Sequence, residues 1–392
     1  MKQIPYGRQW LDEDDRKAVE AVLSSDWLTM GPVLKQFEDS LCSYTGAKYA
    51  VAVANGTVAL HLAMVALGIG KGDKVLTSPV TFAASANCAI YVGAQPEFVD
   101  INEQTYHMDL DRLAEYLKDP QNRQKVKVVV PVHFMGTVMD MKALRAICEP
   151  YGIKIVEDAA HALGASYIDG KKHFKVGACQ HSDAVIFSFH PIKHITTGEG
   201  GAIMTNDAKI YEKLIRFRHH GMVRNSKNVS AYMKKFSDEP WFYDIPQAGF
   251  NFRLNDIQCA LGVSQIKKID PFVARRREMV DRYNKAFAKI KEIHLPYEKP
   301  GTTAAYHLYV IRVPAKKRND LYLYLREQGI GTQINYIPLH LFSMFEQFGF
   351  RPGDFPAAEK YFEECLSLPL YPLLPDDGHQ RIIDNVCKFF KP

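Results

Sequence analysis

The sequence predicts an α/β protein in which a large domain carries a mostly parallel sheet and a smaller α/β domain follows it. Two observations lead to this prediction. Short runs rich in Val and Ile alternate with helical stretches between residues 47 and 205, and this pattern is typical of parallel strands covered by helices on both faces. The chain of 392 residues is also too long for one small core and suits about two domains.

The first part of the chain contains seven candidate strands, at residues 49–54, 73–78, 96–100, 126–134, 153–158, 184–189 and 201–206. Helices are expected between them at residues 57–68, 83–93, 109–117 and 140–152. Several of these strands end in small or polar residues directly before a helix. Because open α/β sheets bind ligands at the carboxyl ends of their strands, we expect the functional site along this edge.

The rest of the chain is expected to be irregular at first, over residues 207–245, and then helical over residues 255–290. A smaller α/β unit should follow, with strands at 307–314 and 332–337 and helices at 318–329 and near 356–366. We therefore divide the chain into a large domain, residues 1–250 with a core at about 12–245, and a small C-terminal domain, residues 251–392.

Composition and charge argue against several classes of protein. The net charge of +5 is spread along the chain, and the densest basic run, residues 273–285, also contains Glu278 and Asp281, so we expect no nucleic-acid partner. The seven scattered cysteines include no C-x-x-C, which indicates buried thiols in a reducing compartment and neither disulfides nor a metal site. No apolar run reaches the ~18 residues of a membrane span, and the N-terminus has no apolar signal segment, so we expect a cytoplasmic protein without a membrane partner.

Two short motifs follow predicted strands and could bind a ligand. Asn55-Gly56-Thr57 ends a strand and opens a helix, where backbone N–H groups and the helix dipole make an anion site, although a simple N-cap explains the same residues. Asp158 and His161 leave another strand and face one side of a helical turn. A buried carboxylate there needs a partner, which could be an internal arginine or a cationic ring nitrogen of a ligand.

Lys193 lies between two apolar runs, bracketed by Pro191 and the glycine-rich turn at residues 198–201. Most lysines are surface residues, but a lysine that loses its water here loses proton affinity and can act as a nucleophile or base, for example by forming a Schiff base. Asn251 and Arg253 precede a further helix and by themselves indicate only its start. No G-x-G-x-x-G opens a helix after a strand, and Walker, H-E-x-x-H and G-x-S-x-G motifs are absent from the sequence.

Taken in order, nine segments of the chain resemble the sugar aminotransferases of the DegT/StrS type, which use pyridoxal 5′-phosphate. The resemblance implies the aspartate aminotransferase type of fold (PLP fold type I), with a mostly parallel seven-stranded sheet in the large domain. It also implies a homodimer with shared active sites. The segments are WLTMGP (27–32), NGTVALHLA (55–63), PVTFAAS (79–85), PVHFMG (131–136), VEDAAHALGASY (156–167), FSFHPIKHITTGEGGAI (187–203), GFNFRLNDIQCALGVSQ (249–265), AYHLYVIR (305–312) and PLHL (338–341).

The resemblance also implies a role for each matching residue. Lys193 would bind the cofactor covalently and then act as the base that moves a proton between the substrate carbon and the cofactor. Asp158 would keep the pyridine nitrogen protonated, and His161, which stands where many relatives have glutamine, would form a hydrogen bond with the phenolic oxygen. Phe82 would stack on the ring. The phosphate would be held by Gly56, Thr57 and Ser188 with Asn251 of the partner subunit, and the sugar-nucleotide pocket would be bordered by Tyr6, Leu28, Thr29, His307 and His340.

The resemblance favours amino transfer from L-glutamate to the 4-keto carbon of a nucleotide-linked 4-keto-6-deoxy sugar. The residues FHP before Lys193 are most similar to those of pseudaminic acid pathway enzymes, which suggests a UDP-4-keto-6-deoxy-N-acetyl-L-altrosamine type of substrate. The alternatives are a GDP-perosamine synthase or another keto-sugar aminotransferase. Relatives with histidine in place of the lysine are dehydratases, but the spacing from Ser188 places Lys193, and not His194, at the cofactor. A non-catalytic regulatory member would lack Lys193 or Asp158, and both are present.

Overall fold

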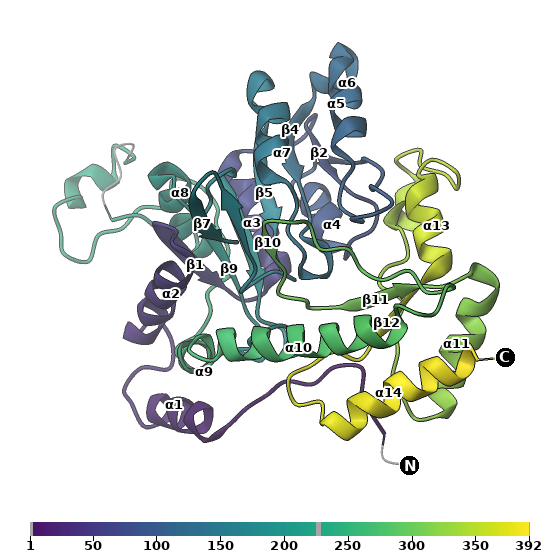
Figure 1. Cartoon of the computed structure of the whole chain (residues 1–392). Coiled ribbons are helices and arrows are strands. Elements are labelled where there is room, and N and C mark those ends of the chain that lie inside the picture. The colour runs from purple at the N-terminus through teal and green to yellow at the C-terminus, as the bar shows by residue number, and fades with distance from the viewer. Residues whose placement is uncertain (1–2, 225–228, 392) are drawn as a thin grey trace.

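The computed structural model describes residues 3–224 and 229–391, and a seven-stranded sheet forms its centre (Figure 1). In sheet order the strands are β1 (Tyr49–Val53), β9 (Gly201–Thr205), β8 (Ala184–Ser188), β5 (Lys154–Asp158), β4 (Val126–Val130), β2 (Lys74–Thr77) and β3 (Gln95–Phe98). Within this sheet β9 runs antiparallel to β1 and β8, and the other neighbouring strands are parallel. The mostly parallel sheet and all seven predicted strands are therefore confirmed.

Helices cover both faces of this sheet, as the near-continuous apolar strands predict (Figure 1). The helices of this part of the chain are α1 (Glu13–Leu23), α2 (Pro32–Thr45), α3 (Gly56–Leu67), α4 (Ala84–Tyr91), α5 (Leu110–Lys118), α6 (Pro120–Arg123), α7 (Met141–Cys148), α8 (Ala208–Arg218) and α9 (Asp256–Ile266). Of these, α1 packs against α9 and α6 against α5, away from the sheet. In β1, Ala50 and Ala52 pack into a buried cluster with α2 and α9, whereas Val51 and Val53 pack into another with α3 and α8. The four helices predicted between the strands are confirmed as α3, α4, α5 and α7.

A small antiparallel sheet beside the main one was not predicted. Its strands are β6 (Ser166–Asp169), β7 (Lys172–Lys175) and β10 (Thr302–Thr303), in the order β10-β6-β7. The β6–β7 hairpin is short and only Ser166 in it is buried, so it lacks the apolar run by which the buried strands were recognised. Through β10 it pairs the chain that follows β5 with the segment between α10 and β11.

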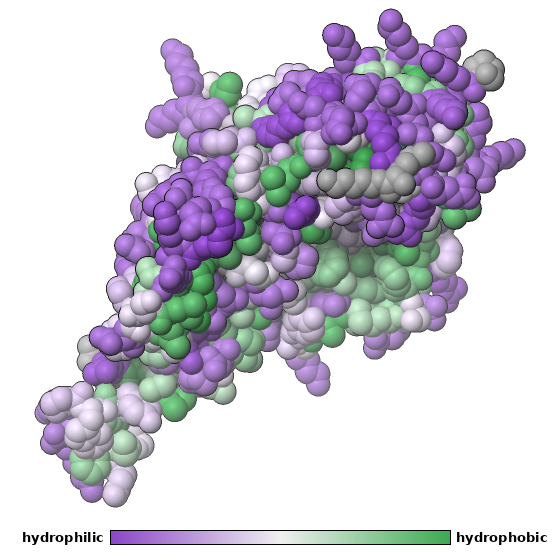
Figure 2. All heavy atoms as spheres, turned by 90° about the horizontal axis from the view of Figure 1, so that it is seen from below, coloured by the Kyte–Doolittle hydropathy of each residue, from purple (hydrophilic) through white to green (hydrophobic). Residues whose placement is uncertain are grey.

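The prediction that residues 207–245 are irregular is wrong for the first part of the segment, which forms the helix α8. Asp207 caps this helix, and Leu214 and Phe217 pack onto the sheet. The many charged residues between these apolar positions concealed the helical period. Residues 225–228 of the segment lie outside the described residues. Residues 229–245 form an arm that projects from the body of the molecule (Figures 1 and 2).

The C-terminal part forms a second α/β unit around a two-stranded antiparallel sheet. The predicted helical stretch at 255–290 consists of two helices, because α9 ends at Ile266 and a new helix starts at Ile269. The elements that follow α9 are α10 (Ile269–Phe287), β11 (Tyr309–Arg312), α11 (Ala315–Glu327), α12 (Ser343–Glu346), α13 (Pro356–Glu364), β12 (Cys365–Leu368) and α14 (Asp376–Phe389).

The prediction of a strand at residues 332–337 is wrong. Within this segment Gln333 forms a single bridge to Ser367 of β12, which in turn pairs with β11. The chain then leaves the sheet and brings the Tyr336 hydroxyl to 3.3 Å from His161 Nε2. A contact with the active-site region therefore replaces continued strand pairing.

The N-terminal arm packs against this second unit. Ile4 lies in a buried cluster that consists otherwise of residues from 279 to 386, and its backbone forms hydrogen bonds with Gly329 and Gly331, at 2.9 and 2.8 Å. The division of the chain near residue 250 stays a prediction. No helix in the described part of the chain has the length and apolar character needed to cross a membrane.

Asp256, the first residue of α9, ties the start of α2 to the core. Its carboxylate accepts hydrogen bonds from the backbone N–H groups of Gly31, Val33 and Leu34, at 3.0, 2.9 and 3.3 Å. Its own N–H donates to the carbonyl oxygen of Leu28, at 3.0 Å. Because the N-cap residue Gly31 has no side chain, this buried carboxylate supplies the cap from a distant part of the sequence.

We expect Asp256→Ala to lower the free energy of unfolding by about 1–3 kcal/mol, because three backbone donors lose a buried anionic acceptor. Urea unfolding of the apoprotein at a fixed protein concentration measures the change. Asp256→Asn is the matched control, since it keeps one acceptor oxygen and should lose less stability. An alanine variant as stable as the parent protein would contradict the capping role.

Candidate active site

The turn between β1 and α3 closes one side of the site. Asn55 caps α3 by accepting a hydrogen bond from the backbone N–H of Val58 at 2.9 Å. Gly56, the next residue, packs closely against β8, since a Cβ added to it would lie 3.0 Å from Ser188 Cβ. The first N–H groups of a helix have no acceptor within the helix. The N-terminus of α3 and the Ser188 side chain therefore meet in a small space suited to an anion.

Gly201 makes this approach possible. It stands opposite Val53 in β1 and opposite Ser188 in β8, so it lies between the two halves of the anion site. A Cβ at this position would lie 2.5 Å from the carbonyl carbon and oxygen of Asn55, far inside contact distance. Any larger residue would have to push the turn away from β8.

Asp158 ends β5 and is buried, with both carboxylate oxygens occupied. Oδ2 accepts a hydrogen bond from Ser85 Oγ at 2.6 Å, and Oδ1 accepts one from the backbone N–H of Ala160 at 3.1 Å. Ser85 lies in turn 2.7 Å from Thr81 Oγ1. No arginine pairs with Asp158 among the described residues, which removes the structural alternative that the sequence left open. Neutral donors thus orient the carboxylate and leave its negative charge uncompensated.

Lys193 lies in the loop that follows β8 and is half-buried. Burial lowers the pKa of its ammonium group from 10.5 to about 8, an effect that the Asp158 charge opposes and the Arg276 charge reinforces. The side chain has no hydrogen-bond or ion-pair partner in the described part of the chain. A lysine of this kind provides a free amine close to neutral pH, as a nucleophile or proton carrier requires.

Three histidine rings lie next to Lys193. The ring centroids of His161 and His307 are 4.4 Å apart, and those of His194 and His307 are 5.8 Å apart. Burial, reinforced by the positive charge of Lys193, lowers the pKa of each histidine well below its usual range. His194 Nε2 lies 3.1 Å from the carbonyl oxygen of Ala305. The rings are therefore neutral, and each leaves a buried Nδ1 without a partner in the described structure.

The other predicted residues lie in different surroundings. The Phe82 side chain is 60% exposed, so one face of its ring is free to stack on a ligand. Leu28 and Thr29 are exposed, and Asn251 is exposed beside His219. The Tyr6 hydroxyl donates to Asn335 Oδ1 at 2.8 Å, and the buried His340 lies 2.8 Å from Glu359 Oε1 through its Nε2. The last two side chains are thus engaged within the protein, and their roles toward a substrate stay predictions.

Three residues of this region were missed in the sequence. Ser85 lies in the recognised segment PVTFAAS, four residues after Thr81, but a small polar residue in a helix gave little reason to single it out. Arg276 belongs to a run of three arginines that was predicted to be a solvated helix face. Its side chain is 1% exposed and donates from Nη1 to the carbonyl oxygens of Tyr306, His307 and Leu370, so the prediction is wrong for this residue. Tyr336 was hidden within the segment expected to be a strand.

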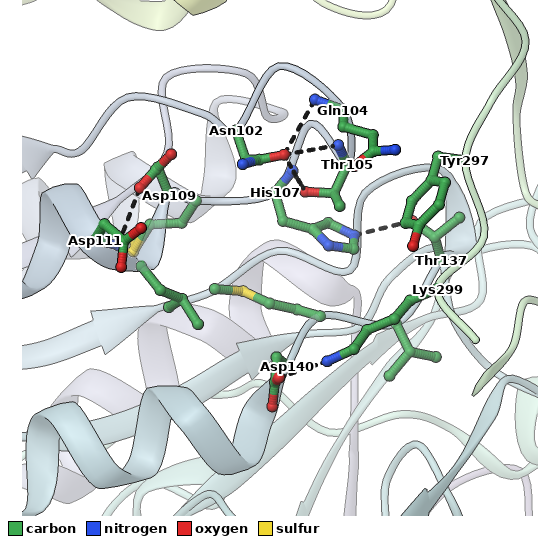
Figure 3. Close-up of a pocket in the computed structure, with 14 residues that line it drawn as sticks. Asn102, Gln104, Thr105, His107, Asp109, Asp111, Thr137, Asp140, Tyr297 and Lys299 are labelled. Atoms are coloured by element: carbon green, nitrogen blue, oxygen red, sulfur yellow. Dashed lines mark hydrogen bonds and ion pairs between the residues drawn. The ribbon is translucent and has the colours of Figure 1, made fainter. Parts of the chain in front are cut away.

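A pocket of about 320 Å³ lies elsewhere, between the loop that precedes α5, the loop that precedes α7 and residues 297–299 (Figure 3). Burial lowers the pKa of His107, whose Nε2 lies 2.9 Å from Thr137 Oγ1, to about 3, and Lys299 pairs with Asp140. None of the predicted site residues lines it. The described residues also contain no group of His, Cys, Asp or Glu side chains suited to a metal ion.

Comparison with known proteins identifies the chain. Residues 9–387 match the model of the DegT/DnrJ/EryC1/StrS aminotransferase family. The chain belongs to this family. It is 38% identical to the spore coat polysaccharide biosynthesis protein SpsC of Bacillus subtilis (strain 168), over 99% of this chain and 97% of that protein. The predicted family and enzyme class are confirmed, and this family member is a sugar aminotransferase.

Solved structures agree with this assignment. The aminotransferase PseC of Helicobacter pylori, involved in pseudoaminic acid biosynthesis, is 30% identical with a TM-score of 0.88, over 99% of each chain. Spr1654 of Streptococcus pneumoniae, in its PLP-form, is 29% identical with a TM-score of 0.88, over 99% of this chain and 98% of that chain. The predicted fold type is thus confirmed.

The residues of the enzyme fit pyridoxal phosphate. The α3 N-terminus and Ser188 form a space for a phosphate, and the glycine at 56 leaves that space open. Asp158 presents an uncompensated carboxylate suited to a protonated ring nitrogen, and Lys193 presents an amine without a partner. The unpartnered Nδ1 of His161 provides a further polar group. These groups match the phosphate, the pyridine nitrogen, the aldehyde and the phenolic oxygen of the cofactor.

We expect Gly201→Ala to weaken the binding of pyridoxal phosphate by a factor of ten or more, a loss of about 1.4 kcal/mol, because the new Cβ displaces the turn at Asn55. Fluorescence titration of the apoenzyme measures the affinity. Gly70→Ala is the matched control, since its Cβ would meet only the carbonyl oxygen of Val92, at 3.8 Å. Equal affinities in the two variants would contradict the proposed function of Gly201.

The pKa of Lys193 predicts how covalent capture of the cofactor depends on pH. Because the free amine forms as the pH rises through about 8, the rate of capture should increase from about pH 7 and level off above about pH 9. The visible absorption band that appears when the apoenzyme is mixed with pyridoxal phosphate follows this rate, with Lys193→Ala as the blank. A rate that continues to rise toward the pKa of an ordinary lysine would contradict this prediction.

Proposed function

We propose that this enzyme uses pyridoxal phosphate to transfer the amino group of L-glutamate to the 4-keto carbon of a nucleotide-linked 4-keto-6-deoxy sugar. The observation that carries the proposal is the position of Lys193 and Asp158. Asp158 is the last residue of β5, and Lys193 lies in the loop that follows β8. Because β5 and β8 are parallel neighbours in the sheet, both residues lie at the same edge. The negative charge of Asp158 acts on Lys193 across this edge.

The proposed roles divide the work among the residues of this chain. The cofactor supplies an electron sink that stabilises negative charge on the carbon next to nitrogen. Asp158 holds a proton on the ring nitrogen through its carboxylate, and Ser85 keeps that carboxylate in place. Lys193 Nζ removes the proton from the carbon of the amino donor and returns a proton to the sugar carbon. The N–H groups at the start of α3, together with Ser188, bind the phosphate and fix the position of the ring.

The position of His194 favours amino transfer over dehydration. In a dehydratase of this family a histidine would replace the lysine, and His194 directly follows Lys193. Here His194 Nε2 lies 3.1 Å from the carbonyl oxygen of Ala305, so the ring is held on the side of the C-terminal unit. Lys193 is left as the basic group at the cofactor. The presence of both Lys193 and Asp158 also argues against a non-catalytic, regulatory protein.

The sugar is proposed to be of the UDP-4-keto-6-deoxy-N-acetyl-L-altrosamine type, as in pseudaminic acid biosynthesis. Two observations support this choice: the residues FHP before Lys193, and the similarity to PseC over 99% of each chain. The higher identity to SpsC, named for spore coat polysaccharide biosynthesis, supports the wider class of surface polysaccharide precursors. The alternative is a GDP-linked or dTDP-linked keto sugar, such as the substrate of a perosamine synthase.

Two copies of the chain are proposed to form a homodimer with shared active sites. Asn251, the residue assigned to the phosphate, is exposed, and its backbone forms a bridge with His219. In a dimer, Asn251 of the partner subunit would complete the phosphate site. The projecting arm also exposes large apolar side chains, Trp241, Tyr243 and Ile245, which a partner would cover.

The test is a panel of UDP-, GDP- and dTDP-linked 4-keto-6-deoxy sugars, each incubated with the enzyme, pyridoxal phosphate and L-glutamate. Mass spectrometry of the sugar and measurement of 2-oxoglutarate give the outcome. We expect an amino sugar and an equal amount of 2-oxoglutarate with one sugar of the UDP series. Loss of water from the sugar without any amino product would overturn the proposal in favour of a dehydratase.

Variants of the two neighbouring residues provide the matched pair for this test. We expect Lys193→Ala to lose the visible band and to slow turnover by roughly a thousandfold or more, because the proton carrier is removed. His194→Ala should keep the band and lose far less activity, since its ring contacts Ala305. The reverse ranking would contradict the assignment of Lys193.

A further inference from the structure

A chain of polar side chains connects the N-terminal arm to His161. The Tyr6 hydroxyl donates to Asn335 Oδ1 at 2.8 Å, and the Tyr361 hydroxyl donates to the backbone carbonyl oxygen of Asn335 at 2.7 Å. The next residue, Tyr336, places its hydroxyl 3.3 Å from His161 Nε2. Its ring lies nearly parallel to that of His161, at an interplanar angle of 23°. Hydrogen bonds from Tyr6 and Tyr361 thus hold Asn335, the residue directly before Tyr336.

The protonation states of the two rings limit how this contact can form. Burial keeps His161 neutral by lowering its pKa and keeps Tyr336 protonated by raising its pKa. A hydrogen bond from the Asn335 side chain opposes the rise in the pKa of Tyr336, as expected when the amide donates to the phenol oxygen. The phenol proton is then free to point at His161 Nε2. When Nε2 accepts this hydrogen bond, the single proton of the neutral imidazole sits on Nδ1.

We propose that Tyr336 is a positioning residue that holds His161 in the tautomer with its proton on Nδ1. In this tautomer Nδ1 is a buried N–H donor without a partner in the described structure. An unsatisfied buried donor destabilises a protein, so this N–H is suited to an acceptor brought by a ligand. The phenolate oxygen of pyridoxal phosphate is such an acceptor.

This inference rests on the proposed role of His161 toward the cofactor. It adds a reason why a histidine can perform that role. An imidazole can present either a lone pair or an N–H, and a lone pair would repel a phenolate oxygen. Tyr336 removes the repulsive tautomer, whereas a side-chain amide would offer an N–H without such help. Lys193, His194 and His307 are the other titratable groups next to His161, and in the described structure none of them forms a hydrogen bond with its ring.

The first test uses the apoenzyme labelled with ¹⁵N-histidine. In the ¹⁵N NMR spectrum of the parent protein, we expect His161 Nδ1 to be the protonated nitrogen and Nε2 the unprotonated one, with His161→Gln identifying the signals. Tyr336→Phe should give a mixture of both tautomers. Tyr309→Phe is the matched control, because its buried hydroxyl contacts Asn284 away from the site. Protonation of Nε2 in the parent protein would overturn the proposal.

The second test is a double-mutant cycle on the affinity for pyridoxal phosphate. Tyr336→Phe should weaken binding about threefold to tenfold when residue 161 is histidine and less than about twofold in the His161→Gln background, since glutamine has no tautomer to fix. Equal losses in both backgrounds would show that Tyr336 acts in some other way. Neither test uses a sugar substrate, so a wrong sugar assignment leaves both outcomes unaffected.

Discussion

The closeness of three backbone segments at Gly201 is the constraint on which the site depends. Gly201 faces Val53 on one side and Ser188 on the other, and its missing side chain lets the turn at Asn55 approach. The antiparallel direction of β9 produces this arrangement, because it places the first residue of β9 beside the last residues of β1 and β8. The turn proposed to bind the phosphate, the proposed ring partner Asp158 and the start of the Lys193 loop are thus all attached to one sheet.

In the candidate site next to these strands, burial affects the pKa values of the side chains more than ion pairs do. Asp158 is held by a serine and a backbone N–H, and Arg276 by three carbonyl oxygens, so each keeps most of its charge effect. The charge of Asp158 raises the pKa of Lys193 and the charge of Arg276 lowers it, while the adjacent histidines stay neutral. Neutral rings fit the role proposed for Asp158, because a cationic histidine would compete for its carboxylate with the ring nitrogen of the cofactor.

Much of this structure follows from the sequence. Most strands of the main sheet are buried on both faces, so their apolar runs are nearly continuous and easily recognised. The polar residues at and after the ends of β5 and β8 indicate the edge that carries the candidate site. The failures have a common cause. Residues 332–337 have the composition of a strand, but contacts with distant residues decide their path. Arg276 was predicted to be solvated because the carbonyl oxygens that accept its hydrogen bonds come from segments distant in the sequence. The cofactor residues were predicted from the order of the sequence motifs and their resemblance to a known family. Predicting Tyr336 would have required knowing that its segment contacts His161.

The position of β9 also determines when the site can form during synthesis. Tyr49 of β1 pairs with Thr205 of β9, which leaves the ribosome long after it. A nascent chain that ends at β8 has parallel strands but no neighbour for β1, so the turn at Asn55 has nothing to hold it against Ser188. Contacts so distant in sequence form late in folding. Acquisition of the cofactor is therefore a late event, and a chain truncated before β9 should expose an apolar strand edge that chaperones must cover.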